Sequence, residues 1–285
     1  MINIMDENDV RMGHLTRGRQ LLALLNPIVE AMCAWDAQEA MSDQLELVVR
    51  SAIVRQNDAL SHAVRAVEEE SAHNVAALVR PAVEELITIS YLATLPRADA
   101  GRFLMLKMGI DLGEALEVQN RLFKNEKDAA SQIPPMDPER QASIRAEMVT
   151  LATKYGWRVR GKGAKAISHG PSMGWMAHET GRRDLYDYLY GGASRLVHFS
   201  PTELLRRCWF DSEGSLSISS QYLERWWASF ALGWGSVLMA ETVAVAIEVV
   251  TLDVTQSPPG DHLALLVEEC RSNVPPLVTL SELNF

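Results

Sequence analysis

The chain has 285 residues and is 47% hydrophobic, which is enough to bury a core and excludes disorder as its main state. Its 27 lysines and arginines against 37 aspartates and glutamates give a net charge of -10, which argues against a protein that coats nucleic acid through its overall charge. The three cysteines, Cys33, Cys208 and Cys270, lie far apart, so neither a disulfide framework nor a zinc knuckle fits, and a reducing cytoplasm is the expected location.

The N-terminal half of the chain predicts a series of helices. Apolar residues recur there at spacings of three and four, as on one face of a helix. The predicted helices cover residues 14–38 with a kink at Pro27, residues from a cap at Ser42 to about 70, residues from a cap at Ser71 through Pro81, and residues 98–127. The pattern leaves open whether Pro81 splits its helix or only kinks it.

The C-terminal half follows a linker at residues 131–138, where three prolines stop regular structure. Its predicted elements are a helix capped by Asp137 that ends near residue 154, a helix over 186–198, a short helix opened by Pro201, a short strand near 215–220, a long apolar helix over 220–252 and a last helix over 261–272. We therefore expect an all-α multi-helix bundle with at most a minor strand. The N-terminal half 1–130 and the C-terminal half 139–285 are expected to pack into a single helical domain over 1–285.

Residues 226–247 are the nearest approach to a membrane span, with Glu241 as their one charge. Charged residues lie directly before and after this stretch, and no other stretch is comparable. We therefore expect a central buried helix rather than a membrane segment. The polar N-terminal residues have no apolar stretch typical of a secretory signal, which also favours a cytoplasmic protein without membrane contact.

A stripe of polar side chains is predicted on the helix over 186–198. Tyr186, Tyr190, Ser194 and His198 follow one another at intervals of four residues. On a helix such residues share one slowly turning face, so two phenols, a hydroxyl and an imidazole would line one groove. The two glycines at 191–192 weaken a helix and suggest close approach of another backbone. In the alternative, structural interpretation the rings are buried, the hydroxyls find carbonyls, and His198 completes the helix end.

Arg80 and Glu84 are four residues apart on an otherwise apolar predicted helix. Charges among so many apolar neighbours are expected to be partly buried, and a buried charge needs a partner. In one interpretation the two side chains simply pair with each other. In the other, both face Ser194 and His198, which would place an anion-binding group, an acid or base and a hydroxyl in one pocket.

The two motifs together resemble a bacterial family, the domain of unknown function 5677. The resemblance covers roughly residues 45–210 and rests on the Arg-Glu helix, on the four-residue series further along the chain, and on the segment 176–181 before that series. It implies an all-helical fold and no settled activity. The residues to which it draws interest are Arg80, Glu84, Tyr186, Tyr190, Ser194 and His198.

A looser resemblance is to the HEPN superfamily, helical bundles that often dimerise and include metal-independent ribonucleases of toxin and phage-defence systems. Their signature is an arginine followed after four to six residues by a histidine, and Arg55 and His62 meet this spacing on one helix face. This alternative catalytic pair departs from the signature at Gln56, where those nucleases commonly have Asn, Asp or His. The more persuasive His198 has Arg195 only three residues before it. In the structural interpretation, Arg55 and His62 belong to a solvated helix face.

A basic loop is predicted at residues 154–165. No acidic residue occurs between Glu147 and Glu179, and the loop combines cations with glycines and with the rings of Tyr155 and Trp157. Its cations are Lys154, Arg158, Arg160, Lys162 and Lys165. Such a composition suits an RNA strand or a phosphate-bearing ligand. The alternative is a solvated loop that balances acidic neighbours.

The sequence predicts no metal site and no cofactor. Glu70 and His73 have the spacing of a di-iron ligand pair, but no second such pair accompanies them. The segment between His169 and His178 contains no cysteine or acidic residue, so it does not support a zinc site. Nucleotide-binding P-loop, nucleophile-elbow and dinucleotide motifs do not occur either.

Together these features predict a metal-independent ribonuclease, or a related nucleic-acid-acting effector of a bacterial toxin or phage-defence system. Its expected catalytic residues are Arg80, Glu84, Ser194 and His198. In the alternative, a non-catalytic helical module binds a partner protein or a small ligand, and the same residues only hold helices together. A homodimer is expected in both cases, with the tryptophan-rich helix over 220–252 as contact surface, and a cognate partner protein is a further candidate.

Overall fold

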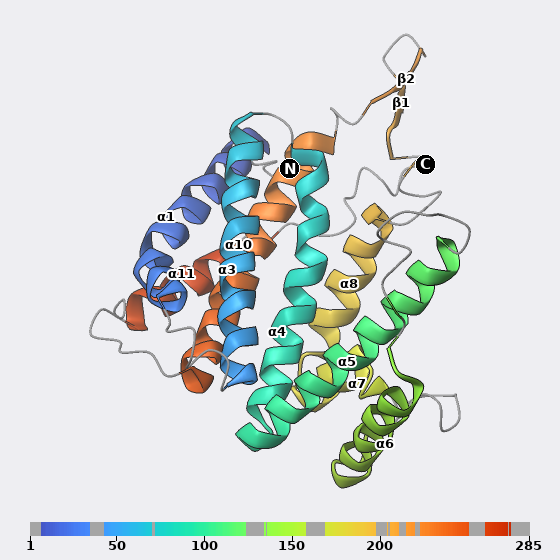
Figure 1. Cartoon of the computed structure of the whole chain (residues 1–285). Helices are drawn as coiled ribbons and strands as arrows, with labels where there is room; N and C mark the ends of the chain where they lie inside the picture. The colour runs from blue at the N-terminus through green and yellow to red at the C-terminus, as the bar shows by residue number, and fades with distance from the viewer. Residues whose placement is uncertain are drawn as a thin grey trace.

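Helices form almost all of the structure, a computed structural model that describes residues 7–34, 43–69, 72–123, 134, 136–157, 169–197, 204, 206–210, 215–219, 223–250, 260–272 and 274 (Figure 1). The α-helices are α1 (Glu7–Cys33), α3 (Gln44–Glu68), α4 (Val79–Ala93), α5 (Arg97–Leu122), α6 (Pro138–Lys154), α7 (Met173–Glu179), α8 (Arg183–Val197), α10 (Glu224–Val249) and α11 (Gly260–Ser272). A 3-10 helix, η1 (Ala72–Leu78), precedes α4, and β1 (Cys208–Phe210) and β2 (Leu216–Ile218) are short strands. The predicted all-α fold is confirmed.

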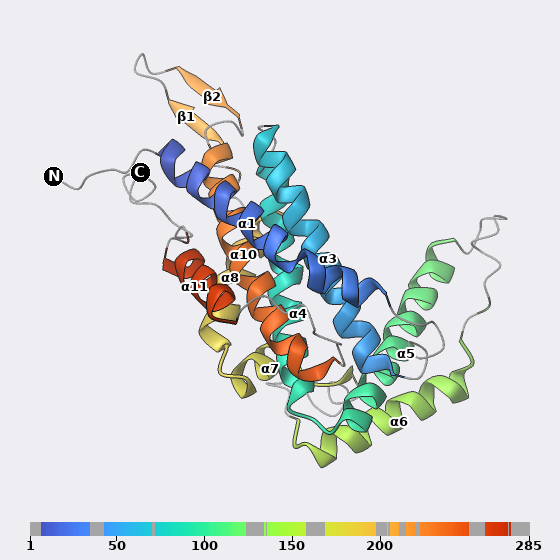
Figure 2. The same cartoon turned by 90° about the vertical axis from the view of Figure 1, so that its left-hand side faces the viewer.

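The two strands form an antiparallel hairpin in which Cys208 lies opposite Ile218 and Phe210 opposite Leu216. The minor strand predicted near residues 215–220 is therefore present over 216–218. Its partner over 208–210 was not expected, because three residues are too few to show an alternating pattern. The hairpin projects from one end of the bundle, and α5 and α6 extend from the other (Figures 1 and 2).

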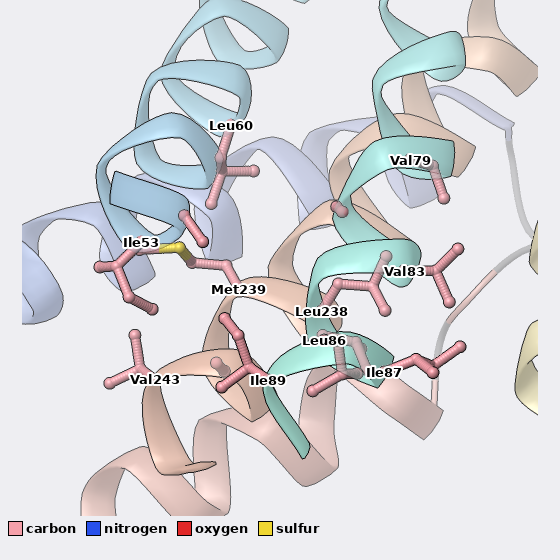
Figure 3. Packing of buried hydrophobic residues seen from close by; sticks show 14 of the residues in the cluster. Ile53, Leu60, Val79, Val83, Leu86, Ile87, Ile89, Leu238, Met239 and Val243 are labelled. Carbon is pink, nitrogen blue, oxygen red and sulfur yellow. The ribbon is translucent and has the colours of Figure 1, made fainter. Parts of the chain in front are cut away.

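Helix α10 lies at the centre of the bundle, packed against α1, α3, η1, α4 and α11 (Figures 1 and 2). Figure 3 shows its Leu238, Met239 and Val243 among the side chains of α3 and α4. A helix that is apolar nearly all round is typical of such a position, since every face can then be buried. Helices from both halves of the sequence share this core.

The same helix is the one described helix that is long and apolar enough to cross a membrane, over Trp226–Val249, and 72% of its most apolar stretch is buried inside the protein. Trp227 is 3% exposed, Trp226 stacks on Phe230, and Trp234 packs against Tyr188. The tryptophans therefore serve the core and are not the open contact surface that we expected. Large exposed hydrophobic side chains gather on α5 instead: Met105, Met108, Leu112, Val118 and Leu122. The homodimer itself stays a prediction.

The boundary between a 3-10 helix and an α-helix lies shortly before Pro81, which answers the question that the sequence left open. The 3-10 helix η1 ends at Leu78 and α4 begins at Val79, so Pro81 stands in the first turn of α4. The backbone nitrogens of a first turn have no intrahelical carbonyl to bind, so a proline is tolerated there. The chain is therefore split before Pro81, and α4 itself continues without a break to Ala93.

The helix caps confirm one prediction and modify another. Asp137 accepts a hydrogen bond from the backbone of Glu139 and Pro138 opens α6, as expected. Helix α3, however, is capped by Asp43, whose Oδ1 accepts from the backbone nitrogen of Glu46 at 3.0 Å, one residue later than the predicted Ser42. Helix α7 was not predicted, because its seven residues are too few to show helical periodicity.

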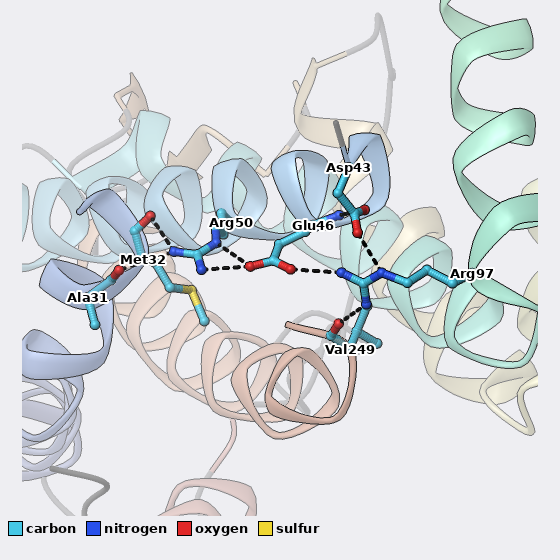
Figure 4. A network of polar contacts seen from close by, with 7 residues as sticks. All are labelled: Ala31, Met32, Asp43, Glu46, Arg50, Arg97 and Val249. Atoms are coloured by element: carbon cyan, nitrogen blue, oxygen red, sulfur yellow. Dashed lines mark hydrogen bonds and ion pairs between the residues drawn. The ribbon is translucent and has the colours of Figure 1, made fainter. Parts of the chain in front are cut away.

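A network of charged side chains joins the ends of four helices (Figure 4). Glu46 and Arg50 pair within α3, and both side chains are less than a tenth exposed. Arg50 Nη1 also donates to the carbonyls of Ala31 and Met32 at the end of α1. Arg97 at the start of α5 reaches the other oxygen of Glu46 at 2.7 Å, and it donates to the carbonyl of Val249 at the end of α10. The network therefore fixes how these four helix ends meet.

Candidate functional site

The candidate site lies where α4 and α8 pack side by side on one flank of the bundle (Figure 1). Arg80 stands in the first turn of α4, and its Nη2 donates to the hydroxyl of Tyr190 on α8 at 3.1 Å. The guanidinium also lies over the ring of Tyr190, with Cζ 4.6 Å from the ring centroid, which is a cation–π contact. Two side chains that are 110 residues apart in the chain are thereby brought together.

Glu84 lies one turn after Arg80 on α4, and Tyr186 lies one turn before Tyr190 on α8, so both helices extend this contact. Arg80 Nε is 3.6 Å from Oε1 of Glu84, and the two side chains are 23% and 34% exposed. The ring of Tyr186 stacks on that of Tyr190 with 4.8 Å between the centroids. Burial raises the pKa of Tyr186 to about 12, with further contributions from Tyr190 and Glu84, so its hydroxyl keeps its proton at neutral pH. Arg80 and Glu84 thus contact each other, and they also face the tyrosine stripe.

Ser194 follows Tyr190 by one turn of α8. Its Oγ is buried and has no hydrogen-bond partner within the described ranges. An unsatisfied buried hydroxyl costs roughly 1 to 3 kcal/mol, so a hydrogen bond to a bound group is one explanation for its retention. His198, the last member of the series, lies outside the described residues.

Gly191 has open space around it on α8. A Cβ atom built there would meet no neighbouring atom within 4 Å. The close approach of another backbone that we expected from the glycine pair is therefore wrong at Gly191. Replacing this glycine would not collide with the described structure, and the helix face next to Tyr190 is open at this position.

Arg55, the first member of the alternative catalytic pair, belongs to a separate cluster on the α3 side of α4. Arg55 forms an ion pair with Glu85, and the buried Gln56 donates to the second carboxylate oxygen at 3.0 Å. Burial raises the pKa of Glu85, although the charge of Arg55 and the hydrogen bond from Gln56 oppose that change. His62 is exposed two turns along α3. Arg55 is therefore engaged by a carboxylate rather than held towards the Arg80 contact.

The described part of the basic segment is more structural than predicted. Lys154 ends α6 and pairs with Asp99 at 2.5 Å. Trp157 is only 4% exposed and donates its indole N–H to the hydroxyl of Tyr91. The expectation that its ring stacks on an RNA base is therefore wrong, because the ring is buried. Tyr155 stacks on Trp157 and donates to Asp99. The other predicted cations, Arg158, Arg160, Lys162 and Lys165, lie outside the described residues.

Metal ligands are not gathered anywhere in the described ranges, where no group of three or more His, Cys, Asp or Glu side chains could hold an ion. Glu70 lies outside these ranges, and so does the side chain of His73. The predicted absence of a metal and a cofactor stays a prediction.

A second polar cluster was missed by the sequence analysis. Glu241 of α10 is 9% exposed and forms ion pairs with Arg182, just before α8, and with Arg271 of α11. Arg182 also donates through Nε to Oγ of Ser90 on α4 at 3.2 Å. The signal was present, because Glu241 is the one charge in a long apolar run and a buried charge needs a partner. Its partners could not be found, since they lie 59 and 30 residues away.

Comparison with known proteins gives one match. A protein-family model described as "Family of unknown function (DUF5677)" matches residues 46–215, which is more than half of the chain. The matched segment contains α4, α8 and the whole of the Arg80 contact. No curated protein and no solved structure matches the chain.

Proposed function

This chain belongs to the family of unknown function DUF5677, which names no activity, and we propose from the site itself that the protein is a metal-independent ribonuclease acting in the cytoplasm. The observation that carries the proposal is the Arg80 contact. A guanidinium lies over one ring of a stacked tyrosine pair and beside a carboxylate, and the next turn of α8 carries an unsatisfied hydroxyl. Together these groups offer partners for a phosphate and for a nucleic-acid base.

Each side chain has a proposed role. Arg80 stabilises the negative charge that grows on the phosphate in the transition state, because its position is already fixed by Tyr190. Tyr186 and Tyr190 offer ring faces and hydroxyl donors to the strand. The hydroxyl of Ser194 donates a hydrogen bond to a phosphate oxygen. The cations that the sequence places in the segment 154–165 add electrostatic attraction for the RNA backbone.

His198 is the proposed general base. It follows Ser194 by four residues in the sequence, which suits the removal of a proton from a ribose 2'-hydroxyl near Arg80. The 2'-oxygen forms a bond to phosphorus and the bond from phosphorus to the 5'-oxygen breaks. The 5'-oxygen then takes a proton from the protonated histidine or from water, and a 2',3'-cyclic phosphate remains.

The second candidate is a non-catalytic module that binds a partner protein or a small ligand. The observation that favours it is that Arg80 already contacts both Glu84 and Tyr190, so the polar groups satisfy one another and hold α4 against α8. Such a network needs no substrate to explain it. The two candidates differ in what the removal of one member does to activity and to stability.

The deciding experiment incubates wild-type protein, His198→Ala and Arg80→Ala with a labelled single-stranded RNA in EDTA, and records the thermal midpoint of each protein. A ribonuclease is expected to release fragments that end in a 2',3'-cyclic phosphate. Both variants should lose cleavage by about a hundredfold or more, with thermal midpoints close to that of the wild type.

Two controls define the outcome. Arg19→Ala removes an exposed arginine that pairs with Glu68 away from the site, so it should cleave as the wild type does. A DNA strand of the same sequence should stay intact, because it lacks the attacking 2'-hydroxyl. Absence of cleavage by the wild type, combined with clear destabilisation in Arg80→Ala, would reject the ribonuclease and favour the binding module.

A further inference from the structure

A pocket of about 370 Å³ opens between α8, α10 and α11. Its charged lining is the cluster of Glu241, Arg182 and Arg271, and its apolar lining includes Leu185, Trp234 and Val237. The volume lies within the range of sites that bind small molecules, about 300 to 1,000 Å³. None of the residues of the Arg80 contact lines this pocket, so it is a site of its own.

The cluster is built around one buried carboxylate. Arg182 Nη1 reaches Oε2 of Glu241, and Arg271 Nη2 reaches Oε1, so that each oxygen has its own guanidinium. Arg182 is held from its other side by Ser90 through Nε. The two arginines are therefore fixed in place while their side chains remain 24% and 49% exposed.

The charge of the cluster is not balanced. Two guanidiniums face one carboxylate, which leaves one excess positive charge beside apolar walls. A guanidinium has five N–H donors. The described contacts use two of those of Arg182 and one of those of Arg271. An anion in the pocket would meet the remaining donors.

We propose that this pocket binds a small organic monocarboxylate with an apolar or aromatic body. Its carboxylate accepts hydrogen bonds from Arg182 and Arg271, and its body lies against Trp234, Leu185 and Val237. Glu241 selects for a single negative charge, because a doubly charged phosphate would be repelled by the fixed carboxylate at close range. The apolar walls favour a hydrocarbon body over a bare inorganic ion.

Isothermal titration calorimetry with benzoate, octanoate and indole acetate tests the proposal. At least one of these carboxylates is expected to bind the wild-type protein. Its uncharged alcohol counterpart and inorganic phosphate should bind about tenfold more weakly or worse. This comparison needs no variant, so it decides the ligand class even if a substitution disturbs folding.

Arg271→Ala locates the binding, with Arg17→Ala as its matched control. Arg17 also forms an ion pair with α11, through Glu269 at 3.1 Å, but it does not line the pocket. Arg271→Ala should weaken carboxylate binding about tenfold or more, while Arg17→Ala leaves it unchanged. No binding by any of the three carboxylates, tighter binding of phosphate, or equal affinity in Arg271→Ala would each overturn the proposal.

Discussion

Helices α3 and α4 each carry an arginine and a glutamate that are four residues apart, and the two pairs differ in distance, in exposure and in order. Glu46 and Arg50 of α3 meet at 2.6 Å, and their side chains are 6% and 8% exposed. Arg80 and Glu84 of α4 are 3.6 Å apart, and their side chains are 23% and 34% exposed. The order also differs, since a glutamate N-terminal to its basic partner is the more favourable arrangement on a helix.

The surroundings separate the two pairs further. Glu46 is bound on its second oxygen by Arg97, and Arg50 is bound by two carbonyls of α1, so the first pair is enclosed by partners (Figure 4). The second pair contacts a stacked tyrosine pair through Arg80 and Tyr190, and Ser194, one turn further along α8, has a buried hydroxyl without a partner in the described structure. The first pair therefore joins helices, whereas the second keeps surface and hydrogen-bonding capacity that a ligand can use.

The largest expected effect is on stability, and it falls on the first pair. Arg50→Ala should lower the free energy of unfolding by about 3 to 5 kcal/mol, because it breaks a buried ion pair and leaves two carbonyls of α1 without their donor. Arg80→Ala should lower it by about 1 kcal/mol or less, since that pair is longer and partly solvated. Urea unfolding of both variants measures the difference, and equal losses would remove the distinction between the two pairs.

The sequence drew attention to only one of the two pairs. Residues 80 and 84 stood out because they are charges within an apolar run. One interpretation paired them with each other, and the other turned both towards Ser194 and His198, on the helix that also carries Tyr190. Glu46 and Arg50 did not stand out, because their partners come from other helices: Arg97 of α5 binds Glu46, and the carbonyls of Ala31 and Met32 of α1 bind Arg50. Helix periodicity predicts which face of a helix is buried, but not which distant helix end supplies a polar partner.

The same limit explains the other differences. The all-α bundle, the central apolar helix and the cap at Asp137 follow from local patterns, which extend over a few turns. The burial of Trp157 could not be predicted, because its position in a basic, glycine-rich segment suggested exposure while its hydrogen-bond partner Tyr91 lies 66 residues earlier. The Glu241 cluster was hidden in the same way, since its arginines lie on other segments.

Glu85 gives a smaller effect, on the dependence of stability on pH. Burial raises its pKa above the ordinary value of 4.5, so the folded protein binds this proton more tightly than the unfolded chain does. Stability is therefore lost as the pH rises from 4.5 through the folded pKa. Glu85→Gln should remove this loss, so that the variant gains stability relative to the wild type as the pH is raised towards neutral.

Urea midpoints at a series of pH values measure the slope for Glu85, and Arg55→Ala provides the control. Arg55 lowers the pKa of Glu85 by its charge. Its removal should therefore raise that pKa further and extend the pH range over which stability is lost. Parallel pH profiles for the wild type, Glu85→Gln and Arg55→Ala would show that Glu85 does not set this dependence.

The smallest expected effect on stability belongs to Ser194. Its buried Oγ has no partner in the described structure, so Ser194→Ala should leave the free energy of unfolding unchanged or raise it by up to about 1 kcal/mol. Ser236 of α10 is the matched control, because it is 1% exposed and its Oγ is also unsatisfied there, yet it lies on the core helix. Both substitutions should be tolerated in urea unfolding, but only Ser194→Ala should reduce RNA cleavage. Equal cleavage by the two variants would show that the hydroxyl of Ser194 has no part in the site, and that an unsatisfied buried serine is simply tolerated in this bundle.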